Sequence, residues 1–180
     1  MINPFLIGDR IYLRPLDEET DLDRCLGWIN DPEVLTTLGR RHPTGRAAER
    51  EWLQEQSKSE EQMNLAIVLV DGGRHIGNCG FNEIDYVNRS AVFGILIGEK
   101  DAWGQGYGPE AARLILKYGF EELGLHRIGL DVYSHNSRAI RAYEKAGFVR
   151  EGTLRESYYR NGVYHDTIVM SVLESEWRDA

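Results

Sequence analysis

The sequence predicts an α+β domain in which helices pack on a mixed, mostly antiparallel sheet. Three observations support this fold class. Three strand-like segments follow one another between residues 64 and 98 and are joined by turn residues. Helical and strand-like segments then alternate between residues 109 and 146, and a hairpin pattern closes the chain. Meandering strands followed by strand–helix units are typical of a sheet with both antiparallel and parallel pairs.

The N-terminal third predicts one strand and two helices. Residues 10–16 alternate apolar and polar side chains, as a strand does. Residues 17–28 begin with acids that suit a helix N-terminus and continue with apolar residues at helical spacing. Asp31-Pro32 breaks this helix. A second helix is expected over 44–57, with Thr44 as its N-cap. The apolar face of that second helix is formed by Ala48, Trp52 and Leu53.

The remaining elements follow from turns and caps. Turn residues at 71–73 and 88–89 separate three strands, expected at 64–70, 74–86 and 90–98. A helix over 109–123 starts with Pro109 and stops at Gly124. After these come a strand over 126–133, a helix over 136–146, and two strands over 148–159 and 164–173 that flank Asn161-Gly162.

Composition narrows the function classes. The 180 residues include 29 Asp or Glu against 21 Lys or Arg, a formal net charge of −8. Nucleic acids and anionic membranes are poor partners for such a chain, and cationic partners such as amines suit it better. We see no signal peptide, no apolar run near the roughly 20 residues that a bilayer requires, and no metal-ligand spacing. Two isolated cysteines, Cys25 and Cys79, indicate reduced thiols in a cytoplasmic protein.

The strongest local motif is the glycine-rich stretch Trp103-Gly104-Gln105-Gly106-Tyr107-Gly108, between a strand and a helix. Glycines let backbone N–H groups converge on an anion, and the helix N-terminus adds further N–H groups. The motif therefore indicates a pyrophosphate cradle, although a turn that merely permits tight packing is the alternative. A dinucleotide-binding fingerprint is a weaker interpretation, because too few residues follow for a doubly wound sheet.

A second motif spans Asn136 to Phe148 and reads N-S-R-A-I-R-A-Y-E-K-A-G-F. An N-capping Asn136 and a C-capping Gly147 explain its ends without any ligand. The two motifs together, in this order and about thirty residues apart, resemble the GNAT superfamily of acetyl-CoA-dependent N-acetyltransferases. The opening segments 10–16 and 28–34 resemble its ribosomal-protein N-terminal acetyltransferase (RimJ/RimL-like) branch.

The resemblance implies a single N-acetyltransferase domain over residues 1–180. Its sheet would have seven strands flanked by about four helices, split between the fourth and fifth strands. Acetyl-CoA would lie in that split. The cofactor-binding positions implied by the resemblance are Leu96, Ile97, Gly98, Trp103, Gly104, Gln105, Gly106, Tyr107, Gly108, Asn136, Ala139 and Tyr143. Trp103 departs from the family, which often has Gln or Arg there, so a polar contact to the cofactor is lost or replaced.

The implied reaction is direct attack of a neutral amine on the thioester, without a covalent enzyme intermediate. Tyr143 occupies the position of the family's thiolate-protonating tyrosine, and a core tyrosine is the alternative interpretation. Some family members place a glutamate base early in the fourth strand, where this chain has Ala91, Val92 and Phe93. We expect Glu83 to act as general base, or water to replace it. The stretch nearest the cofactor, 127–160, is locally basic, with seven Lys or Arg and four Asp or Glu.

Several readings of the acceptor stay open at this stage. The amine could be a protein N-terminal α-amine, or a small molecule such as a polyamine, an amino sugar or an antibiotic. A non-catalytic acetyl-CoA sensor is a third option, and the presence of both Asn136 and Tyr143 argues against it. The oligomeric state also stays open, with a homodimer as one option.

Overall fold

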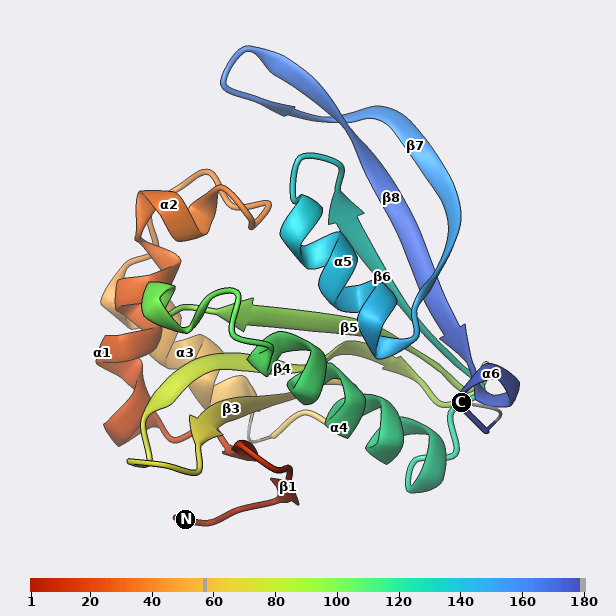
Figure 1. Ribbon diagram of the computed structural model, residues 1–180. Helices are drawn as coiled ribbons and strands as arrows, with labels where there is room; N and C mark the ends of the chain where they lie inside the picture. The colour runs from red at the N-terminus through yellow and green to blue at the C-terminus, as the bar shows by residue number, and fades with distance from the viewer. Residues whose placement is uncertain (57, 179–180) are drawn as a thin grey trace.

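The computed structural model describes residues 1–56 and 58–178, and it is built on one eight-stranded sheet (Figure 1). The strand order is β1-β2-β3-β4-β5-β6-β8-β7. All neighbouring strands are antiparallel except β5 and β6, which are parallel. The strands are β1 (Leu6–Ile7), β2 (Ile11–Pro15), β3 (Met63–Leu69), β4 (His75–Asp85), β5 (Ser90–Ile97), β6 (Arg127–Tyr133), β7 (Val149–Arg160) and β8 (Val163–Leu173).

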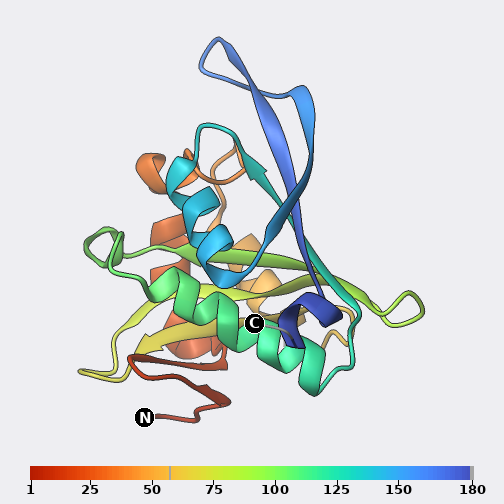
Figure 2. The same ribbon diagram turned by 45° about the vertical axis from the view of Figure 1, so that its right-hand side comes forward.

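Helices cover both faces of this sheet (Figures 1 and 2). The main apolar core lies between the sheet and the helices α4 and α5, while α1 and α3 pack on the opposite face near β2 to β4. Every helix in the described residues is too short or too polar to cross a bilayer. The helices are α1 (Glu18–Ile29), α2 (Pro32–Leu35), α3 (Arg46–Gln56), α4 (Tyr107–Glu121), α5 (Ser137–Ala146) and α6 (Glu174–Arg178).

The sheet opens between β5 and β6. These strands pair only over Ser90–Val92 and Arg127–Gly129, and beyond that point they diverge. Figure 1 shows β6, β7 and β8 turning away from β5. The expected split between the fourth and fifth strands is thereby confirmed, because the short β1 adds one strand to the count ahead of it.

The predicted counts of seven strands and about four helices are too low, because three very short elements escaped prediction: β1, α2 and the five-residue α6. β1 has only two residues. α2 has four residues and begins at the Asp31-Pro32 pair that we interpreted as a helix break. The Asp31 side chain accepts hydrogen bonds from the N–H groups of Glu33 (2.8 Å) and Val34 (3.4 Å), so the same pair that ends α1 also starts α2.

The predicted helix α3 lies where it was expected, but its N-cap and its buried face differ from the prediction. The helix begins at Arg46, and Thr44 does not cap it. Instead, the Thr44 N–H donates to Asn30 Oδ1 at 2.8 Å, which ties this loop to the end of α1. The helix buries Glu49 and Leu53, while Ala48 is exposed. The side of α3 that faces α1 therefore differs from the expected apolar face.

The caps expected for α5 are confirmed. The Asn136 side chain accepts a hydrogen bond from the Ala139 N–H at 3.2 Å, and Gly147 closes α5 with a φ of 106°. α4 starts at Tyr107, two residues before the expected Pro109, because Gly106 occupies the N-cap with a φ of 89°. Both helices therefore begin at the mouth of the split between β5 and β6.

Candidate active site

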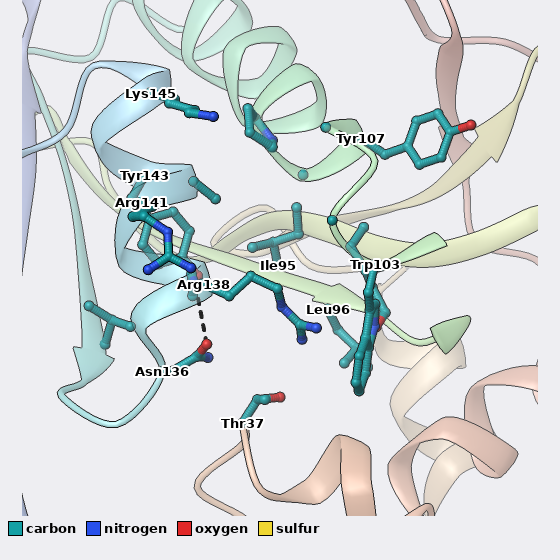
Figure 3. A pocket seen from close by; sticks show the side chains of 18 of the residues that line it. Thr37, Ile95, Leu96, Trp103, Tyr107, Asn136, Arg138, Arg141, Tyr143 and Lys145 are labelled. Carbon is teal, nitrogen blue, oxygen red and sulfur yellow. Dashed lines mark hydrogen bonds between the residues drawn. The ribbon is translucent and has the colours of Figure 1, made fainter. Parts of the chain in front are cut away.

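A cleft of about 330 Å³ lies where β5 and β6 diverge (Figure 3). One wall is formed by residues 95–97 of β5 and by residues 102–104 and 106–109 of the loop and helix start. The facing wall comes from 131–133 of β6 and from α5, and Thr37 adds a contact from the segment after α2. The cleft thus brings together both motifs that the sequence singled out.

The glycine-rich loop has the backbone conformation of an anion cradle. Gly104 and Gly106 have φ values of 76° and 89°, which only glycine adopts easily. No atom lies within 4 Å of a Cβ placed on Gly104 or Gly108, so the loop presents open space there. α4 begins immediately after Gly106, and the free N–H groups and positive dipole end of its first turn favour a phosphate group.

Three cations on α5 reinforce this preference. Arg138, Arg141 and Lys145 follow one another at spacings of three and four residues, and all three line the cleft. None of them pairs with a carboxylate among the residues that the structure describes, whereas Arg10 and Arg127 do pair with carboxylates. A polyanion entering the cleft would therefore meet uncompensated positive charge, although the whole chain is acidic.

Trp103 replaces the polar residue that the motif often carries, and the structure shows what it contacts. Its indole N–H donates to the Ile97 carbonyl at 2.7 Å, which fixes the ring against the end of β5. The Arg138 guanidinium lies 3.9 Å above the ring centroid, in a cation–π contact. Arg138 of α5 thereby places a cation beside Trp103, at the position where the motif often carries a polar side chain.

Tyr143 lies inside the cleft with its ring packed among aromatic neighbours. The ring meets Phe93 and Phe148 edge-on, with centroid separations of 6.3 and 5.8 Å. No hydrogen bond to its hydroxyl occurs within residues 1–56 and 58–178, so the O–H group is free for a ligand. Burial raises the pKa of Tyr143 to about 12, which keeps the phenol protonated at neutral pH.

Most of the predicted cofactor-binding residues line the cleft. Asn136, Ala139 and Tyr143 share one side of α5, and the Asn136 amide nitrogen makes no hydrogen bond within the described chain. Gly98 and Gln105 are not on the wall. Gly98 donates its N–H to the Ile76 carbonyl at 2.9 Å, and the Gln105 side chain donates to the Asp101 carbonyl. The other predicted residues on the wall are Leu96, Ile97, Trp103, Gly104, Gly106, Tyr107 and Gly108.

Glu83 lies beside this cleft, on the sheet face opposite α5. It lines a second hollow of about 270 Å³ together with Asp85 and Asp131. A bulge between Phe81 and Glu83 shifts the β4–β5 register, and Glu83 then stands opposite Val92 on that face. Asp131 lines both the cleft and the hollow, so the two spaces adjoin at this side chain.

Sequence reasoning missed two of the wall residues, Asp131 and Thr37. Asp131 alternates with the buried Leu130 and Val132 along β6, so strand periodicity alone could have placed it on the open face. Thr37 had no such signal, because it follows a four-residue helix that was not predicted.

Comparison with known proteins identifies the family. Residues 10–149 match the family model described as the acetyltransferase (GNAT) domain. The chain belongs to the GNAT acetyltransferase family. A spermidine N(1)-acetyltransferase from Vibrio cholerae is 39% identical over 174 residues, which cover 94% of this chain and 90% of the relative. YdaF of Bacillus subtilis, provisionally named as a ribosomal N-acetyltransferase, is 35% identical over 61% of this chain and 59% of its own length.

A solved structure agrees with this assignment. The crystal structure of a Vibrio cholerae spermidine N-acetyltransferase in complex with CoA and spermine superposes with a TM-score of 0.87. It is 27% identical, and the match covers 95% of this chain and 99% of that one. This acetyltransferase therefore uses acetyl-CoA as cosubstrate and an amine as acceptor.

Proposed function

We propose that this acetyltransferase acetylates a primary amine of a small cationic molecule. The observation that carries the proposal is the hollow formed by Glu83, Asp85 and Asp131, which adjoins the cleft at Asp131. The carboxylates of this hollow favour a cationic acceptor. Two relatives named for spermidine acetylation support the same class of acceptor.

The cofactor side of the proposal rests on the cleft geometry. The loop 104–108 and the first turn of α4 suit the pyrophosphate, and the cations of α5 suit the remaining phosphate charge. Leu96 and Ile97 belong to the stretch of β5 that has no strand partner on its β6 side, where an extended pantetheine arm fits. The free amide of Asn136 can donate a hydrogen bond to that arm. Gly98 supports this wall from behind by packing on Trp28.

The residues then have distinct roles in the transfer. The amine nitrogen forms the new bond to the carbonyl carbon while the carbon–sulfur bond breaks. Glu83, directly or through water, takes the proton that the amine loses. Tyr143 donates its proton to the departing sulfur, and solvent restores that proton afterwards.

Replacing Arg138 with glutamine should weaken acetyl-CoA binding about 10-fold, because a charge-assisted contact to phosphate is lost. S-acetylpantetheine has no phosphate groups, so its affinity should not change. Isothermal titration of both ligands checks this expectation. Arg155→Gln, which removes an exposed charge from β7, is the matched control. Equal weakening for both ligands would show that Arg138 acts on the fold of the cleft rather than on phosphate.

Replacing Glu83 with glutamine should lower kcat/KM for the amine about 100-fold at neutral pH. Asp85→Asn is the comparison for losing one negative charge from the same hollow without losing the base, because the Asp85 carboxylate is already bound by Asn88 and those hydrogen bonds lower its pKa. An unchanged kcat/KM in Glu83→Gln would assign proton removal to water.

A panel of amines tests the proposed acceptor class. Release of free CoA thiol is followed with spermidine, a monoamine, an amino sugar and peptides with free N-termini. We expect the highest kcat/KM for spermidine and a loss of this preference at high salt. Turnover with peptides alone would favour the protein N-terminal α-amine, to which the YdaF similarity points. Tight acetyl-CoA binding without turnover of any amine would favour a sensor.

Two further expectations complete the proposal. A cytoplasmic location suits Cys25 and Cys79, which are both buried and free.

A homodimer would cover exposed apolar side chains on the β7–β8 hairpin, and sedimentation velocity measures that oligomeric state directly. These side chains are Leu154, Tyr159, Val163 and Tyr164.

A further inference from the structure

A short segment that starts at the last residue of α2 crosses from the N-terminal half of the protein to the β7–β8 hairpin. We call residues 35–41 the acceptor strap. Its backbone carbonyls accept hydrogen bonds from the other side of the cleft. Arg160 Nη1 donates to the carbonyls of Leu35 (2.7 Å) and Leu38 (3.3 Å), and His135 Nε2 lies 3.0 Å from the Thr36 carbonyl.

An aromatic stack supports the strap from the hairpin side. The rings of Tyr133 and Tyr158 stack at 3.8 Å, and Arg160 Nη1 also donates to the Tyr158 hydroxyl at 2.9 Å. The strap backbone approaches this stack closely. A Cβ added to Gly39 would lie 2.6 Å from the Tyr133 hydroxyl, so either the strap or the Tyr133 ring would have to move.

The strap reaches the cleft at one end only. Thr37 is its contribution to the wall. Figure 3 shows Thr37 and Lys145 at opposite ends of the cleft, with Arg138 between them, so the strap lies at the end away from Lys145. β5 and β6 have already diverged here, and the contacts named above hold the two sides together.

We propose that Arg160 is a positioning residue that holds the acceptor strap across the amine end of the cleft and so restricts the enzyme to slender amines. This inference rests on the proposed function. Arg160 has no carboxylate partner in the part of the chain that the structure describes, so its charge is directed at the strap carbonyls. Leu35 ends α2, and its carbonyl accepts from the Leu38 N–H at 3.3 Å as well as from Arg160.

Replacing Arg160 with glutamine should release the strap. We expect KM for spermidine to rise about 10-fold, the effect of losing a hydrogen bond to a charged group. The kcat and the dissociation constant of acetyl-CoA should stay within about two-fold of wild type, because Arg160 touches neither the thioester nor the cofactor site. The preference for spermidine over a tripeptide with a free N-terminus should narrow. Amide hydrogen exchange, read by mass spectrometry, should become faster in 35–41.

Lysine should retain part of the function. All three Arg160 contacts come from the single atom Nη1, and a lysine ammonium also offers several N–H donors from one nitrogen. Arg160→Lys should therefore show slower exchange in the strap than Arg160→Gln. Arg155→Gln is the matched control, because it removes a cation from the same hairpin without touching the strap.

Gly39→Ala tests the strap without altering the hairpin. The added methyl group should push the strap off Tyr133 and raise both exchange in 35–41 and KM for spermidine. Gly39→Ala combined with Tyr133→Phe removes the clashing hydroxyl, so exchange in the strap should return toward wild type. This rescue is not expected if Gly39→Ala acts by general destabilisation.

The outcomes separate this inference from the proposed function. Unchanged exchange in 35–41 and unchanged KM in Arg160→Gln would overturn the positioning role, even if spermidine proves to be a good substrate. Conversely, wild-type enzyme that does not acetylate spermidine would overturn the acceptor assignment. In that case, unchanged amide hydrogen exchange in residues 35–41 of Arg160→Gln would still overturn the proposed contact between Arg160 and the strap. Faster exchange would support this contact.

Discussion

Replacing Tyr143 with phenylalanine should lower kcat by about 100- to 1000-fold, the usual contribution of a well-placed general acid. The dissociation constant of acetyl-CoA should stay within about two-fold, because the aromatic ring and its packing remain. The Tyr143 hydroxyl is free of protein partners in the described residues and opens into the cleft, where a departing sulfur can take its proton. Stopped-flow or steady-state thiol release, together with titration of acetyl-CoA, measures both quantities.

The pH dependence gives a second check on Tyr143. Burial raises its pKa to about 12, so the proton that it donates is present at neutral pH and is lost only as the pH approaches that value. Loss of this proton therefore begins only in strong base. Any decline of wild-type kcat between about pH 8 and pH 10 should belong to another group, and Tyr143→Phe should leave the position of that decline unchanged.

Tyr118→Phe is the matched control for Tyr143. Tyr118 lies on α4, packs edge-on against Phe5 at 5.1 Å and does not line the cleft. Loss of its hydroxyl should leave kcat unchanged. Equal kcat for Tyr143→Phe and wild type would remove the acid role, and the thiolate would then leave without a proton from the protein.

Local signals explain why the sequence located the cleft. Asn136 and Gly147 determine where α5 begins and ends through their own backbone and side-chain preferences, and no distant contact is needed. The glycines before α4 act in the same way. Such signals depend on a few neighbouring residues, so they survive without knowledge of the fold.

The parts that the sequence did not reveal depend on contacts between distant segments. Thr44 resembles a helix cap, yet its N–H is bound by Asn30, fourteen residues away. The carbonyls of the acceptor strap are bound by Arg160, more than a hundred residues away. Gly98 looked like part of the cofactor wall, but its Cα packs against Trp28 from α1. Neither spacing nor periodicity contains this information.

The largest expected effect on stability comes from a buried ionic cluster on the opposite face from α5. Asp21 of α1 is 2% exposed, and its carboxylate accepts two hydrogen bonds from Arg14 of β2, both at 2.7 Å. His75 of β4 lies 3.1 Å away, and the Asp17 N–H donates at 2.9 Å. One carboxylate thus joins α1 to two strands of the sheet.

Replacing Asp21 with alanine should lower the free energy of unfolding by about 3–5 kcal/mol, because the Arg14 charge stays in its poorly solvated position without a partner. Urea denaturation at pH 7 measures this change. Asp23→Ala is the matched control. Asp23 lies on the same helix and pairs with Arg46, but its side chain is 78% exposed, so solvent screens the pair and little stability should be lost. Similar losses in the two variants would contradict the assigned importance of burial.

Acid unfolding should reveal the contribution of the same ionic cluster to stability. Burial alone would raise the pKa of Asp21, but hydrogen bonds from Arg14, His75 and the Asp17 N–H outweigh it and hold that pKa well below its usual range. A lowered pKa stabilises the folded state above the ordinary Asp value of about 4, and this contribution is lost as the pH falls toward the folded-state value. Wild-type stability should therefore fall more steeply below pH 4 than that of Asp21→Asn. Parallel acid unfolding curves for the two proteins would show that Asp21 titrates normally in the folded state.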